Sequence, residues 1–331
     1  MTAKSCGPAM ALAVLLLVTA CGPGRRLSSA PSVETKSAVS PVIAPGQYSG
    51  ITRIAGDRYA VVDDKLRGGG IVFFEIPVDP ATGAVGQVKA EVPPATTLSN
   101  VSDMDSEGIA YADGMLYVTA ESDQSIREYD LSGNATGRVF TIPEEMGIDR
   151  IEPNAGFEAF TYNAATRRFW TTTERPLLKD TAQVRLHRLQ CFHPDLRPGR
   201  QYLYRMDEPL RSPADTRAYV HGISALTALD DGSLLVLERE VYVPASLVRA
   251  IGETFSVTKI YQVFPSEGGT DILPKRLLVE FSTRASNLAN YEGMCLGPVL
   301  QDGRQTLLLI ADSQGGYNGL TREYLKVIVL P

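Results

Sequence analysis

The pattern that decides the fold is clearest in the stretch EGIAYADGMLYVTAE, residues 107–121. It begins with an acid and a glycine, continues with mostly apolar residues, turns at Asp113-Gly114 and ends in a β-rich run that Glu121 closes. Two β-rich runs joined by Asp-Gly are the strongest short-range signal for a β-hairpin. This segment is therefore predicted to form two antiparallel strands.

Related stretches recur along the chain at intervals of 51 to 68 residues. They begin at Ser49, Glu107, Glu158, Ser224 and Glu292. Each is followed by more strand-like sequence, such as GIVFFEI at 70–76, so that each unit holds about four strands. Repeats of this length and content are typical of β-propellers. We therefore predict an all-β fold, a propeller of five four-stranded antiparallel blades, or of six if the longer intervals hold extra strands.

The ends of the repeat region make a further prediction. One more strand-like segment, 324–330, follows the last hairpin, and residues before Ser49 are expected to complete that blade and close the ring. Cys191 and Cys295 would then lie in blades that are not neighbours, so we expect two buried thiols and no disulfide between them.

Composition excludes several classes of function. The chain has 331 residues, 32 Lys+Arg and 38 Asp+Glu, and a net charge of −6, which argues against a nucleic-acid partner. Only three His are present, so a His-rich metal site is not expected. The sequence contains no nucleophile elbow, zinc-binding H-E-x-x-H, C-x-x-C or P-loop motif. We expect a monomer.

The N-terminus has the pattern of a lipoprotein signal. Lys4 precedes the apolar run Ala9–Val18, which is too short to span a bilayer but suits a signal peptide. The run leads into VTAC, which ends at Cys21 and resembles the bacterial lipoprotein box, whose Cys carries the lipid. A plain signal peptide that is cut nearby is the alternative.

These features divide the chain into three parts. We predict a signal peptide at 1–20, a lipidated Cys21 with a flexible tether at 21–45, and the propeller at 46–331. The Ser-, Ala- and Pro-rich composition of the middle part suits a tether. The domain is expected on the extracytoplasmic side of a bacterial envelope membrane, held by its lipid anchor alone.

Acidic residues mark both ends of the predicted hairpins. Because paired strands are antiparallel, the start of the first strand and the end of the second lie at the same edge. If the first strand lines the channel, eight carboxylates gather around one opening. They are Asp63, Glu107, Glu121, Glu158, Glu174, Glu238, Glu292 and Asp312. Like charges this close repel one another unless they are protonated, paired or bridged by a cation.

One segment, DMDSEG at 103–108, strengthens the case for a cation. Its alternating acids would share one side of an extended strand. The twelfth position is Gly114, which excludes a true EF-hand but leaves another calcium loop open. Oxygen-rich sites suit hard cations, so we predict Ca²⁺ in preference to Mg²⁺. The predicted metal ligands are Asp105, Glu107, Glu158 and Glu292.

The remaining acids and two arginines complete the predicted site. Glu121, Glu174 and Glu238 are the candidate catalytic residues, as general bases or as groups that orient the ligands, and Arg175 and Arg239 would contact an anionic substrate. The alternative is structural, with the acids accepting backbone hydrogen bonds or pairing with arginine. A separate basic run could hold a phosphate or form a solvated loop face. It contains Arg167, Arg168, Arg175, Lys179, Arg185 and Arg188.

Five motifs in order resemble the bacterial phytase-like family that is described as having esterase-like activity. They are SGI at 49–51, DSEGI at 105–109, NAGFEAF at 154–160, LERE at 237–240 and NYEGM at 290–294. The resemblance covers about 46–331 and implies a propeller-type domain in a secreted or envelope protein. It also implies hydrolysis of phosphate or carboxylic esters, without indicating which residues are catalytic.

Two functions follow from these observations. The first is a metal-assisted hydrolase, in which a divalent cation on the rim carboxylates neutralises a small anionic ester. The second is a non-catalytic, lipid-anchored binding or scaffold propeller with an envelope partner, since a fold does not determine its function.

Overall fold

The computed structural model describes seven segments of the chain. They are residues 35–38, 46–64, 70–99, 105–181, 185–265, 272–314 and 321–330. By its internal contacts, Ser32–Pro331 forms one compact unit. The predicted signal peptide, Cys21 and Asp103 lie outside the described residues.

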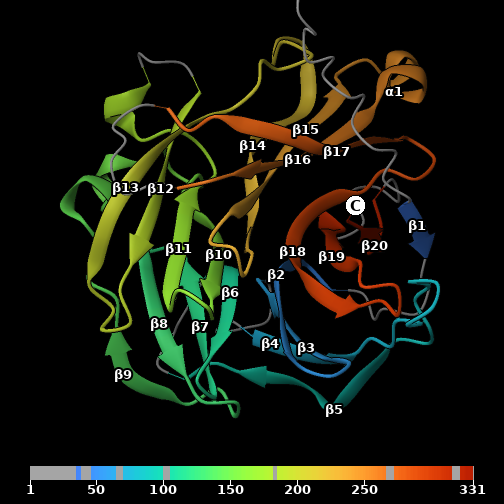
Figure 1. The fold of residues 1–331 in the computed structure, drawn as a ribbon. Helices are drawn as coiled ribbons and strands as arrows, with labels where there is room; N and C mark the ends of the chain where they lie inside the picture. The colour runs from blue at the N-terminus through green and yellow to red at the C-terminus, as the bar shows by residue number, and fades with distance from the viewer. Residues whose placement is uncertain are drawn as a thin grey trace, which may run out of the picture. The chain divides into compact units, whose positions relative to one another are not determined.

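The strands form five antiparallel sheets of four strands each, arranged as the blades of a five-bladed propeller (Figure 1). The prediction of an all-β propeller is confirmed, with five blades. In blade one the strands are β2 (Tyr48–Ala55), β3 (Arg58–Asp63), β4 (Gly70–Glu75) and β5 (Lys89–Thr97). In blade two they are β6 (Ser106–Ala112), β7 (Met115–Ala120), β8 (Ser125–Tyr129) and β9 (Ala135–Val139).

Blades three to five repeat this order from the channel outward. Blade three contains β10 (Phe157–Asn163), β11 (Arg168–Thr173), β12 (Leu186–Phe192) and β13 (Pro198–Arg205). Blade four contains β14 (Thr216–Ala228), β15 (Leu234–Pro244), β16 (Phe255–Val263) and β17 (Lys275–Arg284). Blade five contains β18 (Asn290–Val299), β19 (Gln305–Asp312), β20 (Leu325–Val329) and β1 (Thr35–Ala38).

The ring closes through the two ends of the propeller region. β1 pairs antiparallel with β20, so that Thr35 lies opposite Ile328 and Ala38 opposite Leu325. Residues before Ser49 therefore do complete the last blade. This strand lies within the segment that was expected to be a tether.

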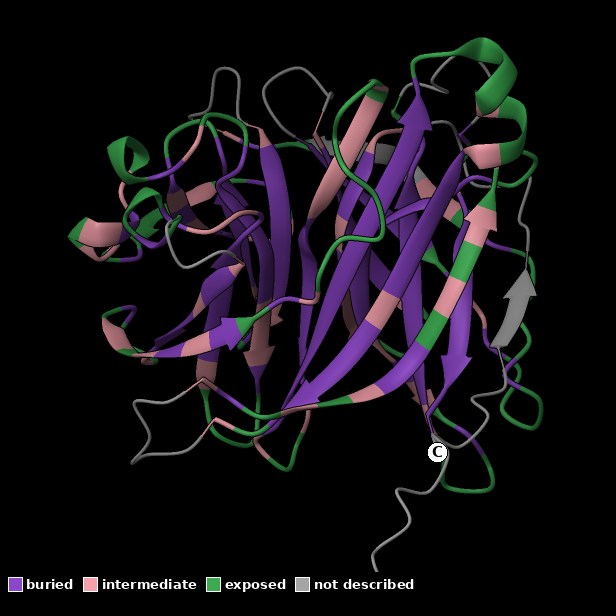
Figure 2. Cartoon of the chain, turned by 90° about the horizontal axis from the view of Figure 1, so that it is seen from above, coloured by how far each residue is buried: buried purple, intermediate pink, exposed green. Residues whose placement is uncertain are grey.

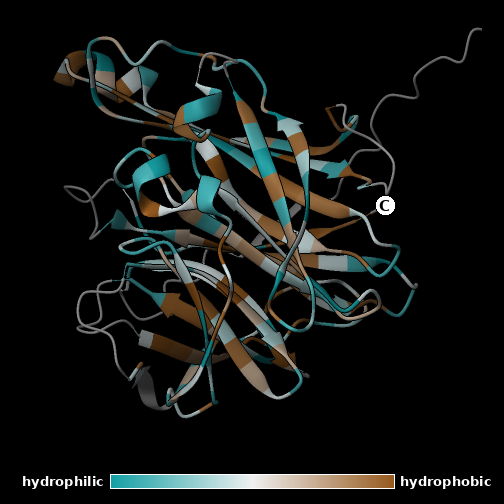
Figure 3. Cartoon of the chain, turned by 90° about the vertical axis from the view of Figure 1, so that its left-hand side faces the viewer, coloured by the Kyte–Doolittle hydropathy of each residue, from teal (hydrophilic) through white to brown (hydrophobic). Residues whose placement is uncertain are grey.

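The hydrophobic core lies between the blades. Successive residues of a strand point to opposite faces of its sheet, so each inner blade strand supplies two different cores. In β3, Tyr59 and Val61 pack against blade five, whereas Ala60 and Val62 pack against blade two. Figure 2 shows the inner strands as buried, and Figure 3 shows hydropathy changing from residue to residue along the strands.

Cys191 and Cys295 belong to different inter-blade cores. Cys191 packs between blades three and four, and Cys295 between blades one and five. Both are free, buried thiols, which agrees with their predicted positions in blades that are not neighbours.

Each innermost strand is irregular at the residue where its repeat begins. The register shifts at Ser49-Gly50, Glu107-Gly108, Glu158, Ser224 and Glu292. Such β-bulges redirect a side chain out of the regular alternation. The five innermost strands surround the centre of the view in Figure 1, so the bulges lie around the propeller axis.

Adjacent inner strands approach closely at these bulges. A Cβ atom on Gly50 would lie 2.6 Å from the Glu107 carbonyl oxygen and 2.8 Å from the Ile109 nitrogen. Only glycine fits this approach of blade one to blade two without a shift of the backbone.

Helices are minor elements. The described residues contain one α-helix, α1 (Leu247–Glu253), and 3₁₀ turns at Glu144–Met146, Ile148–Arg150 and Leu178–Asp180. None of the helices in this part of the chain combines the length and apolar character needed to cross a bilayer.

Candidate active site at the axial mouth

One end of the channel opens into a cavity of about 360 Å³. Eight carboxylate side chains and two guanidinium groups line it, together with Gln47, Asn154, Tyr219, Val220, Asn290 and Gln314. The carboxylates are those of Asp64, Asp105, Glu107, Glu121, Glu158, Glu174, Glu292 and Asp312. The predicted convergence of acids at one mouth is therefore observed, with two changes in membership.

The lining follows the fivefold repeat. In each blade, two residues lie opposite each other at the mouth. One lies on the innermost strand side, two positions before the bulge, and its partner lies on the second strand or directly after it. These opposed pairs are Gln47 and Asp64, Asp105 and Glu121, Gly156 and Glu174, Gly222 and Arg239, and Asn290 and Asp312. Equivalent positions thus carry an acid in four blades and an arginine in blade four.

This equivalence explains why Asp63 and Glu238 are not in the cavity. Each lies one residue before the position that reaches the mouth, and neighbouring residues on a strand face opposite sides. Asp63 is buried at the end of β3, and Asp64 lines the cavity in its place. Glu238 accepts hydrogen bonds from the Tyr204 hydroxyl and Lys275 Nζ, each at 2.5 Å. It lines a different, smaller cavity with Asp207 and Lys259.

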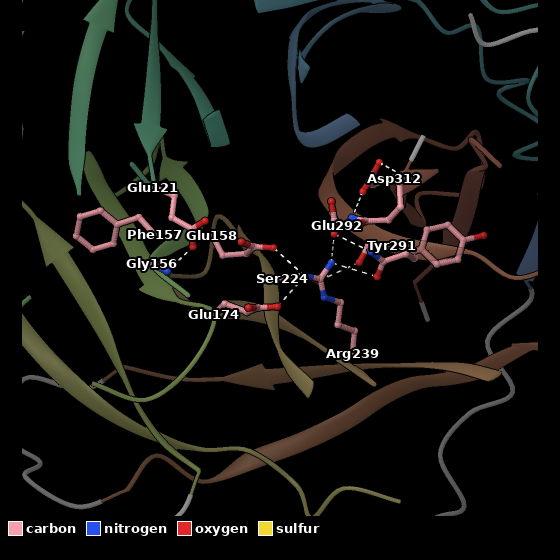
Figure 4. Close-up of polar contacts among 12 residues, drawn as sticks. Glu121, Gly156, Phe157, Glu158, Glu174, Ser224, Arg239, Tyr291, Glu292 and Asp312 are labelled. Carbon is pink, nitrogen blue, oxygen red and sulfur yellow. Dashed lines mark hydrogen bonds and ion pairs between the residues drawn. The ribbon is translucent and has the colours of Figure 1, made fainter. Parts of the chain in front are cut away.

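Arg239 connects three blades. Its Nη2 donates to Glu158 Oε1 at 3.0 Å and to Glu174 Oε1 at 2.8 Å, both from blade three. Its Nη1 donates to Asn290 Oδ1 at 3.1 Å and to Glu292, both from blade five (Figure 4). Only 5% of Arg239 is exposed. The guanidinium was expected to meet a substrate, but it is engaged by these carboxylates.

Gly222 makes room for this arrangement. It lies opposite Arg239, and a Cβ atom there would lie 2.5 Å from Glu174 Cγ and 2.8 Å from the Glu174 carbonyl oxygen. The Ile223 amide donates to that same carbonyl at 3.1 Å. Blades three and four are therefore joined directly below the ion pairs.

A second group of acids lies on the side of blades one and two. Asp64, Asp105 and Glu107, here called the carboxylate cluster, each offer an oxygen within 4.8 Å of the others. Such a set of oxygen donors is consistent with a divalent cation. Of the four predicted metal ligands, Asp105 and Glu107 belong to this cluster. Glu158 and Glu292 are bound by Arg239 instead.

Burial is the main cause of the raised pKa values of three lining acids, Glu107, Glu121 and Asp312. Burial, with the nearby Glu292 charge, raises the pKa of Glu107 well above its usual range. Burial likewise raises the pKa of Glu121 to about 7, although its Oε1 accepts the Gly156 amide at 2.5 Å. The pKa of Asp312 is raised to about 8, also mainly by burial. A bound cation would oppose each of these shifts.

Arg175 lines the cavity in a more open setting. Its side chain is 42% exposed, and its Nη1 donates to Glu152 Oε2 at 2.9 Å. Of the two arginines that were predicted to contact substrate, Arg175 is the one with a guanidinium that solvent reaches.

Sequence reasoning missed Asp64 as a ligand candidate and missed the position of Arg239. For Arg239 a usable signal existed, because counting seven residues from the turn glycines Gly114 and Gly232 leads to Glu121 and Arg239. The same count from Gly56 leads to Asp63, so it does not find Asp64. Counting from the first acid of each repeat fails, since the hairpins differ in length.

Comparisons with known proteins extend these findings. No curated protein matches the chain. The endo-arabinase of Bacteroides thetaiotaomicron VPI-5482 is similar in structure at 11% identity and a TM-score of 0.49, over 89% of this chain and 97% of the arabinase. The PQQ-bound aldose sugar dehydrogenase of Streptomyces coelicolor gives 13% identity and a TM-score of 0.45, over 90% and 98% of the two chains. Neither similarity supports an argument about activity.

A family model gives a more specific result. The model described as phytase-like, esterase-like activity of phytase, matches residues 43–314. That span includes the first four blades, the inner hairpin of blade five and every lining residue of the axial cavity. The chain therefore belongs to this phytase-like family.

Proposed function

We propose that this protein is an ester hydrolase whose axial cavity binds a divalent cation together with an anionic ester. The observation that supports this most directly is the carboxylate cluster, with oxygens of Asp64, Asp105 and Glu107 within 4.8 Å of one another at the wall of the cavity. The cavity, at about 360 Å³, has the size of a small-molecule site.

The residues fit a hard cation by their chemistry. All three donors are carboxylates, and burial, with the nearby Glu292 charge, raises the pKa of Glu107. Ca²⁺ accepts such ligands readily, and Mg²⁺ is the alternative. When bound, the cation would neutralise the anionic group of the ester and polarise its reacting bond.

Electrostatics restrict how a substrate can enter. Eight carboxylates and two guanidinium groups give the cavity an excess of negative charge, so an anionic ester would be repelled in the absence of a cation. Arg175, with its partly exposed guanidinium, would orient the anionic group from the other side.

Glu121 is the general base in this proposal. Its pKa of about 7 allows it to gain or lose a proton near neutral pH, and the Gly156 amide fixes its Oε1. It would take a proton from a water molecule as the water oxygen bonds to the ester centre. The bond to the leaving oxygen then breaks, and that oxygen receives the proton from Glu121. Glu174 is tied to Arg239 and Glu238 lies outside the cavity, so neither competes for this role.

The test is hydrolysis of para-nitrophenyl phosphate, para-nitrophenyl acetate and inositol hexakisphosphate by the purified protein, with Ca²⁺, Mg²⁺ or EDTA. We expect turnover of at least one ester that EDTA removes. Glu107→Gln and Glu121→Gln should abolish it in folded protein, while Glu280→Gln, on the outer strand β17, should leave it unchanged. Absence of turnover with every ester and cation would refute hydrolysis, and turnover that survives EDTA would refute the role of the cation.

One observation favours the alternative of a binding or scaffold propeller. Arg239 satisfies three of the acids inside the protein, as a purely structural role requires. In that case no ester would be turned over, and the Ca²⁺-dependent change in melting temperature described in the Discussion would be absent.

We also propose that Cys21 carries a lipid and holds the domain at the extracytoplasmic side of an envelope membrane. The support is the VTAC motif after an apolar run. A Cys21→Ser variant should lose incorporation of labelled palmitate and move from the membrane fraction to the soluble fraction. Retention of both in the variant would refute the anchor.

A further inference from the structure

A second cavity, of about 490 Å³, lies between blades three and four. Thr166 lines it from the β10–β11 turn and Arg168 from the start of β11, and Asp231 and Gly232 line it from the β14–β15 turn. These turns are at the opposite ends of the inner strands from the bulges that face the axial mouth. The cavity, here called the blade 3–4 groove, is therefore separate from the proposed active site.

Two arginines, Arg168 and Arg200, line this groove, with His193 among their neighbours in the lining. Among the described residues that line it, Asp231 is the only acid. Asp231 Oδ1 already accepts the Ser233 amide at 2.9 Å and the Ser233 hydroxyl at 2.6 Å. A protein with a net charge of −6 thus has a local excess of positive charge at this place.

Arg168 differs from its neighbours in the basic run of the sequence. The other four arginines of that run pair with carboxylates: Arg167 with Asp113, Arg175 with Glu152, Arg185 with Glu208 and Arg188 with Asp180. Across the described ranges of the chain, no ion pair involves Arg168. Its Nη1 instead lies 2.5 Å from His193 Nδ1, which must be the acceptor, so a neutral group positions the guanidinium.

Aromatic side chains also line the groove. Trp170 and Tyr202 pack together with their ring centres 5.6 Å apart, and the Arg200 guanidinium lies over the Tyr202 ring at 5.4 Å. Phe264, at the open edge, is 53% exposed. Flat rings bind well to such surfaces, and the guanidinium fork matches a carboxylate or a phosphate.

We propose that the blade 3–4 groove binds a small aromatic anion, a molecule with one flat ring that carries a carboxylate or a phosphate group. The ring packs against Trp170, Tyr202 and Phe264, and the anionic group is bound by Arg168 and Arg200. The volume of about 490 Å³ lies within the range of small-molecule sites. Because the acids of the axial mouth are absent here, this ligand needs no cation.

Trp170 offers a direct measurement, because it is the only tryptophan of the chain. The fluorescence of the purified full-length protein, excited at a tryptophan-selective wavelength, is titrated in EDTA with phenyl phosphate and with benzoate. Inorganic phosphate tests the need for a ring, and benzyl alcohol tests the need for a charge. We expect a saturable change with at least one aryl anion, and the one that binds more tightly identifies the preferred group.

Variants separate this site from the axial mouth. Arg168→Gln and Arg200→Gln should each weaken binding by about tenfold or more, since a charged hydrogen bond is lost. Arg200 is exposed, so its variant keeps the fold. Arg249→Gln, on α1, is the matched control, and Glu107→Gln should leave binding unchanged whatever its effect on ester hydrolysis.

Three results would overturn the proposal. They are no saturable change with either aryl anion, equal affinity for benzyl alcohol, and unchanged affinity in both groove variants when circular dichroism shows them folded. None of these results depends on whether the axial mouth hydrolyses an ester.

Discussion

Replacement of Arg239 by methionine should destabilise the protein in a way that depends on pH. Arg239 is 5% exposed and forms ion pairs with Glu158, Glu174 and Glu292, which are also buried. Methionine keeps much of the apolar stem but removes the charge. Removal of one partner from a buried ionic group typically costs about 3–5 kcal/mol, because the remaining charges are uncompensated.

The pH dependence follows from the carboxyl groups. Burial raises the pKa of Glu158 and of Glu292 in the folded protein, and Arg239 opposes this rise. Without Arg239, these groups keep their protons to higher pH in the folded variant than in the folded wild type. Wherever the folded variant holds one proton more than the folded wild type, the stability penalty grows by about 1.4 kcal/mol per pH unit. The penalty should therefore be larger at pH 8 than at pH 5.

Urea denaturation at pH 5 and pH 8, in EDTA, measures both penalties from the midpoint and slope of each transition. Arg249→Met is the control, because Arg249 is exposed on α1 and pairs with Glu253. An equal loss of stability at the two pH values would mean that Arg239 acts through packing alone. No loss at either pH would contradict the whole account of the ion pairs.

Three further predictions concern the same region. The metal-free wild type should itself lose stability between about pH 5 and 8. The folded-state pKa values of Glu121 (about 7) and Asp312 (about 8) lie above those of the unfolded chain, so the protons that stabilise the fold are lost as pH rises. A flat stability profile in EDTA would contradict this. Ca²⁺ should raise the melting temperature at pH 8, by an amount that grows with its concentration, and the Glu107→Gln variant should lose this response. Equal responses of the variant and the wild type would contradict Ca²⁺ binding at the carboxylate cluster. Gly50→Ala should lower the free energy of unfolding by about 1–3 kcal/mol, measured by urea denaturation, because its Cβ meets backbone atoms of blade two. Gly252→Ala, whose Cβ meets nothing within 4 Å, should be neutral or slightly stabilising. Similar effects at both sites would contradict the close approach of the strands.

The fold was accessible from the sequence because its signals are local. An Asp-Gly turn between two β-rich runs identifies a hairpin without knowledge of the rest of the chain, and Asp113 and Gly114 do adopt the positive φ angles of 49° and 84° that such a turn requires. The number of blades followed from counting the hairpins. The closing strand Thr35–Ala38 could be expected in general terms only, because four residues carry little pattern of their own.

The candidate site could be predicted only in part, because its details depend on contacts between residues far apart in the sequence. Acids at the ends of hairpins were correctly expected to converge. Which of two adjacent residues faces the axis, however, depends on which side of the strand each occupies, and this alternates from one residue to the next. A one-residue difference separates Asp63 from Asp64 and Glu238 from Arg239, and only the register with the inner strand decides it. The pairing of Arg239 with acids from blades three and five depends on contacts more than 50 residues apart, which no local pattern encodes.

The way the ring closes also bears on where the domain can be cut. The family match ends at residue 314 and begins at residue 43, so it omits both β20 and β1. A fragment trimmed to those limits would keep only two strands of its last sheet and would leave β19 as an unprotected edge. A fragment that starts at 46 keeps β20, whose residues Leu325–Val329 are all buried in the intact protein, but uncovers its hydrogen-bonding edge. Bare edges of this kind invite pairing with other chains and aggregation, so recombinant versions of the domain need to begin before Thr35 and to extend through Leu330.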